Sequence, residues 1–294
     1  MEAVGKSSYS PSVAQLLTCG KPEGAEAKDW PDYLALGLGP ENIPALIAMA
    51  TDEDLNNADE ESLEVWAPVH AWRTLGQLHA DDAIEPLLAL FKLQADSEWV
   101  IEELPEVYGM LGPAALPALT TFISDAANDE WPRVIAVNSI EKIAQYTPDA
   151  RTMCVEILSR QLEQFQAEEY EFNAALVHSL VELQAKEAAP LIERAMAADA
   201  VETFLMGDWE DIQEALGLLS PEELEKLQQR RQEEQNARMA FLENPLQAPS
   251  LSPGSFPMVS ASDVEVSRSR GTAVKKSKQR QKMAKQSRKK NRKR

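Results

Sequence analysis

"LGPENIPALIA" occupies residues 38–48, and "LGPAALPALTT" occupies residues 111–121. Both stretches open with Leu-Gly-Pro and continue with Pro-Ala-Leu, in a chain without low-complexity bias over this region. Such internal similarity is the sequence signature of a repeated structural unit, and it decides the fold before any single element is assigned.

The second proline of each stretch belongs to a longer series. Apolar residues at helical spacing follow each of Pro44, Pro86, Pro117 and Pro190. Proline is tolerated in the first turn of a helix, where its missing N–H would have no partner, so each proline predicts a helix start. The series skips one position, and we expect a helix without this proline at residues 150–162.

Another periodic segment precedes each of these later helices. These segments cover residues 62–78, 97–112, 132–146 and 171–185. Two of them contain a Leu-Gly pair, at Gly76 and Gly112, which predicts a helix end at or next to each glycine. The predicted unit is helix A, a short turn, helix B and a longer loop. Since one helix pair cannot bury both apolar stripes, we expect the units to stack.

Composition supports the same fold class. Hydrophobic residues make up 44% of the 294 residues and aromatic residues only 6%, which favours helices over sheets. We predict an all-α fold, a right-handed α-solenoid of about five helix pairs with a disordered basic C-terminal tail. The expected parts are an N-terminal segment with one short helix (1–28), the repeats (29–219), a capping helix (220–244), a disordered linker rich in Pro and Ser (245–267) and the basic tail (268–294).

The repeats resemble HEAT repeats, in particular the short bacterial type that also occurs in phycobilisome lyases. "EWPRVIAVNSIEKIA", residues 130–144, is similar to helix A of that type, with Arg133-Val134 where the family has Val-Arg or Arg-Val. The resemblance covers residues 29–219, although the other units lack this arginine. It implies a helical-repeat fold, and it implies an auxiliary phycobilin lyase-like protein acting on phycobiliproteins as an alternative function.

An acid followed by an aromatic residue recurs where helix A is expected to begin. The pairs are Asp29-Trp30, Glu98-Trp99, Glu130-Trp131, Glu169-Tyr170 and Asp208-Trp209. We expect each ring to pack over the preceding turn, with the acid favourably located at a helix N-terminus. The alternative is a ladder of rings that contacts a ligand.

No histidine lies at the spacing of a metal site. His70, His79 and His178 have no ligand-like partners nearby, and we interpret them as core or surface residues. No phosphate-binding glycine loop or nucleophile turn occurs either. We therefore expect a protein that is not an enzyme and that needs no metal and no cofactor.

One acidic stretch comes close to a calcium loop. Asp52, Asp54 and Asn56 occupy the first, third and fifth loop positions. The loop needs glycine at the sixth position and glutamate at the twelfth, where this chain has Asn57 and Leu63. We expect no EF-hand there.

Cysteine content and hydropathy bear on the location of the protein. Cys19 and Cys154 are too few for a disulfide framework, so we interpret both as small buried residues in a reducing cytoplasm. The N-terminus lacks the pattern of a secretory signal, and no stretch approaches the roughly 18 apolar residues of a membrane span. We expect a cytoplasmic monomer without a membrane span.

Charge divides the chain into two parts. The last 27 residues, 268–294, hold 14 Lys and Arg and no acid, which leaves residues 1–267 at a net charge of −33. The tail has no aromatic residue to stack on bases, so it would neutralise phosphates of RNA or a ribosome without reading sequence. The alternative is an arm that docks on the acidic body and regulates it. The predicted nucleic-acid-binding residues are Lys275, Lys276, Lys278, Arg280, Lys282, Lys285, Arg288, Lys289, Lys290, Arg292, Lys293 and Arg294.

The loops that follow the B helices are rich in acids. Stacked repeats bring equivalent loops to one edge, where a line of negative charge attracts a basic protein partner. The predicted protein-binding residues are Asp52, Asp54, Glu60, Asp96, Asp125, Asp129, Glu168, Glu169 and Asp199. The leading hypothesis is a non-catalytic scaffold or adaptor that binds a protein through its repeats.

Overall fold

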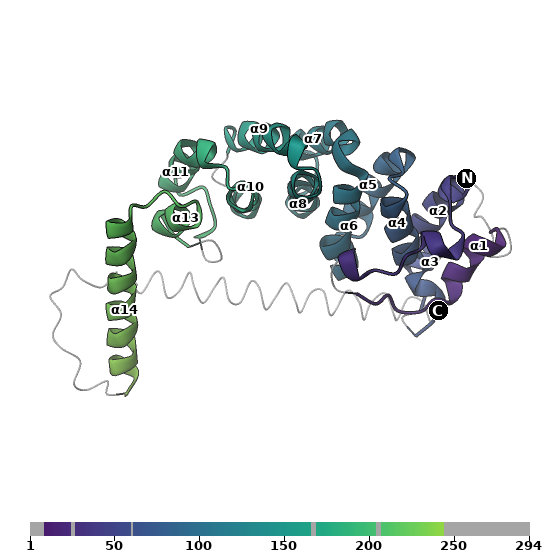
Figure 1. Cartoon of the computed structure of the whole chain (residues 1–294), viewed down its shortest axis with the longest axis horizontal. Coiled ribbons are helices and arrows are strands. Elements are labelled where there is room, and N and C mark those ends of the chain that lie inside the picture. The colour runs from purple at the N-terminus through teal and green to yellow at the C-terminus, as the bar shows by residue number, and fades with distance from the viewer. Residues whose placement is uncertain (1–8, 25–26, 60, 166–168, 204–206, 244–294) are drawn as a thin grey trace. The chain divides into compact units, whose positions relative to one another are not determined.

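The computed structural model describes residues 9–24, 27–59, 61–165, 169–203 and 207–243 (Figure 1). Over these residues every regular element is an α-helix or a short 3₁₀ turn, so the predicted all-α class is confirmed. The chain divides into two compact units, Met1–Leu227 and Gln228–Arg294. The predicted linker (245–267) and basic tail (268–294) lie outside the described residues.

The B helices begin near the anchor prolines. They are α2 (Ile43–Ala50), α5 (Ile84–Leu93), α7 (Leu116–Ser124), α9 (Arg151–Leu162) and α11 (Ala189–Ala197). Pro44, Pro117 and Pro190 lie in the first two positions of their helices, and Pro86 is the third residue of α5. The helix expected without a proline is α9. The prediction that these prolines start helices is therefore confirmed.

The A helices alternate with the B helices along the chain. They are α4 (Ala67–Gln77), α6 (Glu98–Leu111), α8 (Glu130–Tyr146) and α10 (Tyr170–Glu182). A 3₁₀ turn directly precedes each B helix, including the first one, α2, which has no A helix before it. These turns are η4 (Pro40–Asn42), η6 (Asp81–Ala83), η7 (Gly112–Ala115), η8 (Pro148–Ala150) and η9 (Lys186–Ala188). The two similar stretches at residues 38–48 and 111–121 thus encode the same 3₁₀ turn and helix start.

Consecutive helix pairs in the first unit are direct neighbours. α4 contacts α6, α6 contacts α8, and α8 contacts α10. In the same way α2, α5, α7, α9 and α11 each contact the next member of their row, as the order of the ribbons in Figure 1 also shows. One hydrophobic core, from Val13 to Leu216, lies between these helices.

The two Leu-Gly pairs have different roles. Gly112 has a φ of 77° directly after α6, as predicted for a glycine at a helix end. At Gly76 the predicted helix end lies one residue later, since α4 runs to Gln77, but the left-handed residue there is His79, with a φ of 49°. A Cβ at Gly76 would lie 3.0 Å from Sδ of Met110 on α6. Gly76 therefore serves the close approach of α4 and α6.

The N-terminal segment packs against the first helix pair. It contains α1 (Pro11–Ala14) and the 3₁₀ turn η1 (Gln15–Thr18) and ends in the turn η2 (Ala27–Asp29); the turn η3 (Leu34–Leu36) follows it. Val13 and Leu16 are fully buried, and η1 contacts α4. This segment is therefore part of the core of the first unit.

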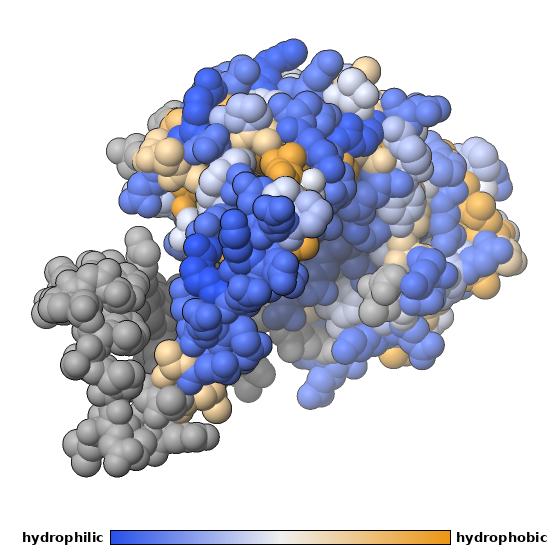
Figure 2. Space-filling view, turned by 60° about the vertical axis from the view of Figure 1, so that its left-hand side comes forward, coloured by the Kyte–Doolittle hydropathy of each residue, from blue (hydrophilic) through white to orange (hydrophobic). Residues whose placement is uncertain are grey.

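Two helices follow the repeats, α13 (Trp209–Ala215) and α14 (Pro221–Glu243). The start of α14 has the predicted capping box: the backbone N–H of Ser220 donates to Oε2 of Glu223 at 2.8 Å, and the Glu223 N–H donates to Ser220 Oγ at 3.4 Å. In Figure 2, where α14 comes forward, its surface is hydrophilic along most of its length. Its predicted capping role stays a prediction.

One stretch of the described chain, Glu98–Ser124, is long and apolar enough for a membrane span. It consists of α6, η7 and α7, and the backbone turns at Gly112, whose φ is 77°. More than half of its apolar window, 56%, is buried inside the protein. These features are typical of two packed core helices, and no clear membrane span results.

Candidate functional site

The predicted acidic residues lie in the loops between a B helix and the next A helix. The described members are Asp52 and Asp54 after α2, Asp96 before α6, Asp125 and Asp129 between α7 and α8, Glu169 before α10, and Asp199 after α11. Glu60 and Glu168 lie outside the described residues. If the helix pairs stack as predicted, these loops lie at one edge of the stack. We call these seven described residues the acidic edge.

Three members of the acidic edge, Asp52, Asp125 and Glu169, also stabilise local structure. Oδ1 of Asp52 accepts a hydrogen bond from the Leu55 N–H at 3.0 Å, at the start of α3 (Glu53–Asn56). Oδ1 of Asp125 accepts from the Ala127 N–H at 2.9 Å. Asp125 is exposed, as are Asp54, Asp96, Asp129 and Asp199.

The stretch that comes close to a calcium loop has a helical conformation instead. Asp52 caps α3, and Nδ2 of Asn56 donates to the carbonyl oxygens of Ala50 and Asp52 at 3.0 and 2.9 Å. These side chains satisfy the backbone of their own turn. The expectation that this stretch is not an EF-hand agrees with this geometry.

Glu169 forms an ion pair with the arginine of the HEAT-like stretch. Nη1 of Arg133 lies 2.6 Å from Oε1 of Glu169, and the Arg133 Nε donates to the carbonyl of Ile123 at 2.8 Å. The guanidinium carbon lies 3.7 Å from the centre of the Phe172 ring. Arg133 is buried and joins α8 to the first turn of α10 and to the end of α7. These contacts give it a structural role.

In four of the five acid-aromatic pairs the acid lies at a helix N-terminus, as expected. Glu98 and Glu130 are in the first turns of α6 and α8, whereas Glu169 and Asp208 are the N-caps of α10 and α13. Glu130 also accepts a hydrogen bond from the Phe172 N–H at 2.9 Å, which links the starts of α8 and α10. Burial raises the pKa of this carboxyl.

The aromatic rings of these pairs do not share one environment. Trp30 is only 7% exposed, and Trp99 packs edge to face on Trp66 with ring centres 5.2 Å apart. Lys21 Nζ lies about 6 Å from the centres of both of these rings, at 5.9 and 6.0 Å. Trp131, however, is 59% exposed, so the expectation that every ring packs is wrong for this residue. Its neighbour Glu130 turns toward α10, and the ring faces solvent.

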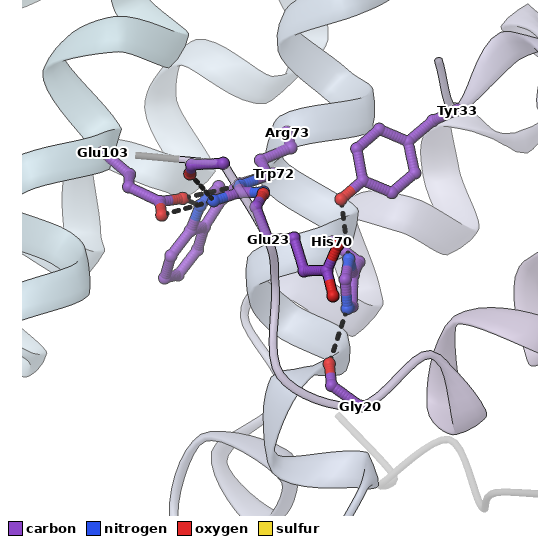
Figure 3. Close-up of polar contacts among 8 residues, drawn as sticks. Gly20, Glu23, Tyr33, His70, Trp72, Arg73 and Glu103 are labelled. Atoms are coloured by element: carbon purple, nitrogen blue, oxygen red, sulfur yellow. Dashed lines mark hydrogen bonds and ion pairs between the residues drawn. The ribbon is translucent and has the colours of Figure 1, made fainter. Parts of the chain in front are cut away.

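Sequence reasoning missed a buried ion pair between α4 and α6 (Figure 3). Arg73 is 0% exposed, and its Nε and Nη2 donate to Oε2 and Oε1 of Glu103 at 2.8 and 2.6 Å. Nη1 and Nη2 of Arg73 also donate to the carbonyl oxygens of Glu23 and Gly24. A charged residue inside an apolar helical stripe was the available signal. This pair anchors the N-terminal segment on the A helices.

His70 holds the same segment (Figure 3). Its Nε2 lies 2.8 Å from the carbonyl oxygen of Gly20, and its Nδ1 lies 2.6 Å from the hydroxyl of Tyr33. A carbonyl can only accept, so Nε2 carries the proton and Nδ1 accepts from Tyr33. Burial lowers the pKa of His70 and raises the pKa of Tyr33 to about 12. This is a neutral core histidine, consistent with the sequence interpretation.

The remaining histidines and the cysteines show no shared site. His79 and His178 are exposed, and within the described ranges no group of three or more His, Cys, Asp or Glu could hold a metal ion. Cys154 is buried as predicted, whereas Cys19 is exposed. Cys19 follows the turn η1, whose apolar residue Leu16 faces the core in its place.

The predicted nucleic-acid-binding residues of the tail, from Lys275 to Arg294, lie outside the described residues. Comparison of the chain with models of known protein families, with curated proteins and with solved structures finds no match. The resemblance to HEAT-like repeats therefore stays a prediction.

Proposed function

We propose that this protein is a non-catalytic scaffold whose helix pairs form a right-handed HEAT-like α-solenoid. In this proposal the acidic edge binds a basic protein partner, and the basic tail (268–294) adds affinity for RNA or a ribosome. The protein acts in the cytoplasm as a monomer, without a metal or a cofactor.

The observation that carries this proposal is the position of the acids. They recur in the loops between consecutive helix pairs, and five of them, Asp54, Asp96, Asp125, Asp129 and Asp199, are exposed. Charges of one sign along an edge raise the local concentration of an oppositely charged partner and speed its association. The net charge of −33 over residues 1–267 acts in the same direction.

Neutralisation of the edge tests this part of the proposal. The edge variant changes Asp54, Asp96, Asp129 and Asp199 to asparagine. The control variant changes four exposed acids outside the edge, Glu41, Asp82, Glu156 and Glu193, to their amides.

The probe is a fluorescent peptide rich in arginine and lysine, titrated at several salt concentrations. Both variants have the same net charge, so only a local site separates them. We expect the edge variant to bind the peptide at least several-fold more weakly than the control variant. Equal affinity of the two variants, or no binding by the natural chain at low salt, contradicts a docking edge.

The tail requires a separate experiment with single-stranded RNA. We expect the full chain to bind RNA with an affinity that falls steeply with salt, and residues 1–264 to lose this binding. A chain with the tail sequence scrambled is the matched control, because phosphate neutralisation depends on charge and not on sequence order. Binding that survives truncation would exclude the tail as the RNA-binding part.

Two alternatives make different predictions. If the tail docks on the acidic edge, removal of residues 265–294 strengthens binding of the basic peptide. If the chain is an auxiliary phycobilin lyase-like protein, the purified protein binds a bilin and shows its absorbance. A colourless protein whose peptide binding does not change on truncation excludes both alternatives.

A further inference from the structure

An open groove of about 400 Å³ lies between α5 and α7 in the first unit. Its apolar wall includes Leu88 and Phe122, which are 7% and 8% exposed. Two exposed acids, Glu85 on α5 and Asp125 directly after α7, also line it. Lys92 is its one cationic lining residue. The groove thus combines an aromatic ring with a surplus of negative charge.

Asn128, at the same groove, has an acceptor without a partner. Its side chain is 6% exposed, and Nδ2 donates to the carbonyl of Phe122 at 2.8 Å. Oδ1 is buried and has no hydrogen-bond partner. An unsatisfied buried carbonyl is unfavourable, and a donor that reaches it is correspondingly favoured. Because Oδ1 is closed to solvent here, a donor must displace part of the groove wall to reach it.

The ammonium group of Lys92, a residue of the protein itself, already lies in part of the groove. Nζ of Lys92 lies 5.2 Å from the centre of the Phe122 ring, within the range of a cation–π interaction. This ammonium stands in for an external cation and identifies the ring face as a place where one is stable.

We propose that the groove between α5 and α7 binds an arginine side chain of the basic partner, with Lys92 moving aside. This inference rests on the proposed function, since Asp125 belongs to the acidic edge. The guanidinium stacks on Phe122 and donates to the carboxylates of Glu85 and Asp125 and to Oδ1 of Asn128. Arginine fits better than lysine because its planar group carries five donors and stacks on aromatic rings.

Charge variants of the groove test this inference with the same fluorescent peptide. Lys92→Met removes the internal competitor, so we expect it to tighten peptide binding. Arg194→Met, on α11 and outside the groove, makes the same change in net charge. We expect Lys92→Met to bind about threefold or more tighter than Arg194→Met, and Asp125→Asn to bind more weakly than the natural chain. Equal binding by the two methionine variants overturns the proposal.

An amide resonance gives a readout that does not depend on net charge. We expect the side-chain NH₂ signal of Asn128 to shift in NMR spectra as an arginine-rich peptide saturates the protein, and to shift less with a lysine-only peptide. Asn173 is the control, because its Nδ2 also donates to a carbonyl, that of Ala200, at 2.8 Å in a buried position. Shifts of both signals, or of neither, contradict binding in this groove.

These experiments distinguish a failure of the proposed groove from a failure of the proposed acidic edge. If the edge variant loses binding while Lys92→Met equals Arg194→Met and the Asn128 signal does not move, the acidic edge binds the partner but the groove does not. If the natural chain binds no basic peptide at low salt, both proposals are wrong.

Discussion

The guanidinium of Arg73 and the carboxylate of Glu103 form two parallel hydrogen bonds, at 2.8 and 2.6 Å, between neighbouring helices α4 and α6. The Trp72 Nε1–H also donates to Glu103 Oε2, at 3.4 Å. The four guanidinium hydrogen bonds of Arg73 end on Glu103 and on the carbonyls of Glu23 and Gly24. One buried cation therefore organises the N-terminal segment and the first two A helices.

Loss of one partner of this pair leaves the other as an uncompensated buried charge. We expect Glu103→Gln to reduce the free energy of unfolding by about 3–5 kcal/mol, measured by urea denaturation. Glu102→Gln, at an exposed position next to it on α6, is the control and should change stability by less than about 0.5 kcal/mol. Similar effects of the two variants would show that the pair contributes little.

The His70 contacts predict a pH dependence of stability. The pKa of His70 is lowered in the folded state, so below its ordinary value of about 6.5 the unfolded chain binds more protons. The stability from neutral His70 is therefore complete above that pH and is lost as the pH falls toward the folded-state pKa.

We expect thermal denaturation to show a larger loss from about pH 7.5 to about pH 5.5 in the natural chain than in His70→Gln, which can retain both hydrogen bonds. The raised pKa values of Glu130 and Glu141 act in the opposite sense, since protonation is easier in the folded state. Both carboxyls are present in the two proteins, so the difference isolates His70. Parallel pH profiles would refute the prediction.

Close approach of the A helices predicts different outcomes at two helical glycines. A Cβ at Gly109 would lie 2.8 Å from Tyr146 Cδ2 and 3.1 Å from Lys142 Cβ, both on α8. We expect Gly109→Ala to lower the free energy of unfolding by about 1–3 kcal/mol, because the steric clash outweighs the gain from the higher helix propensity of alanine.

At Gly76 the added Cβ would lie 3.0 Å from the thioether sulfur of Met110, which belongs to a flexible side chain. Methionine adapts readily, so we expect Gly76→Ala to be close to neutral in the same urea denaturation. A larger loss at Gly76 than at Gly109 would contradict this account of the α6 and α8 contact.

The two cysteines should differ in reactivity. Cys19 is exposed and Cys154 is buried, with its pKa raised to about 11 by burial. Because the thiolate is the reactive form, we expect a thiol reagent to modify one cysteine in the folded protein and two after unfolding. Cys19→Ser should abolish the reaction of the folded protein, and persistent labelling would show that the core around Cys154 opens.

The helix pairs could be predicted because their signals are local. A proline followed by apolar residues at helical spacing marks a helix start wherever the rest of the chain lies, as at Pro44 and Pro117. The packing role of Gly76 could not be predicted because it depends on Met110, a residue of another helix. Cys19 and Trp131 were misjudged for the same reason, since exposure is a property of the packed chain.

Only part of the candidate site could be predicted in the same way. The acids of the acidic edge are recognisable in sequence because they follow each B helix. The groove needs Lys92, Phe122 and Asn128 to meet across two helices, and the Arg73–Glu103 pair joins residues of two different repeats. Neither arrangement has a spacing that marks it in the sequence.

The connections between the helices differ at the two edges of the repeats. At one edge a compact 3₁₀ turn leads into each B helix, and at the other the connectors range from residues 94–97 to residues 51–66. We therefore expect that the connectors at the acidic edge can change length without a change in helix packing. An affinity tag, a fluorophore-binding peptide or a second domain inserted there should leave the core intact, which makes this the edge at which the protein can be re-engineered.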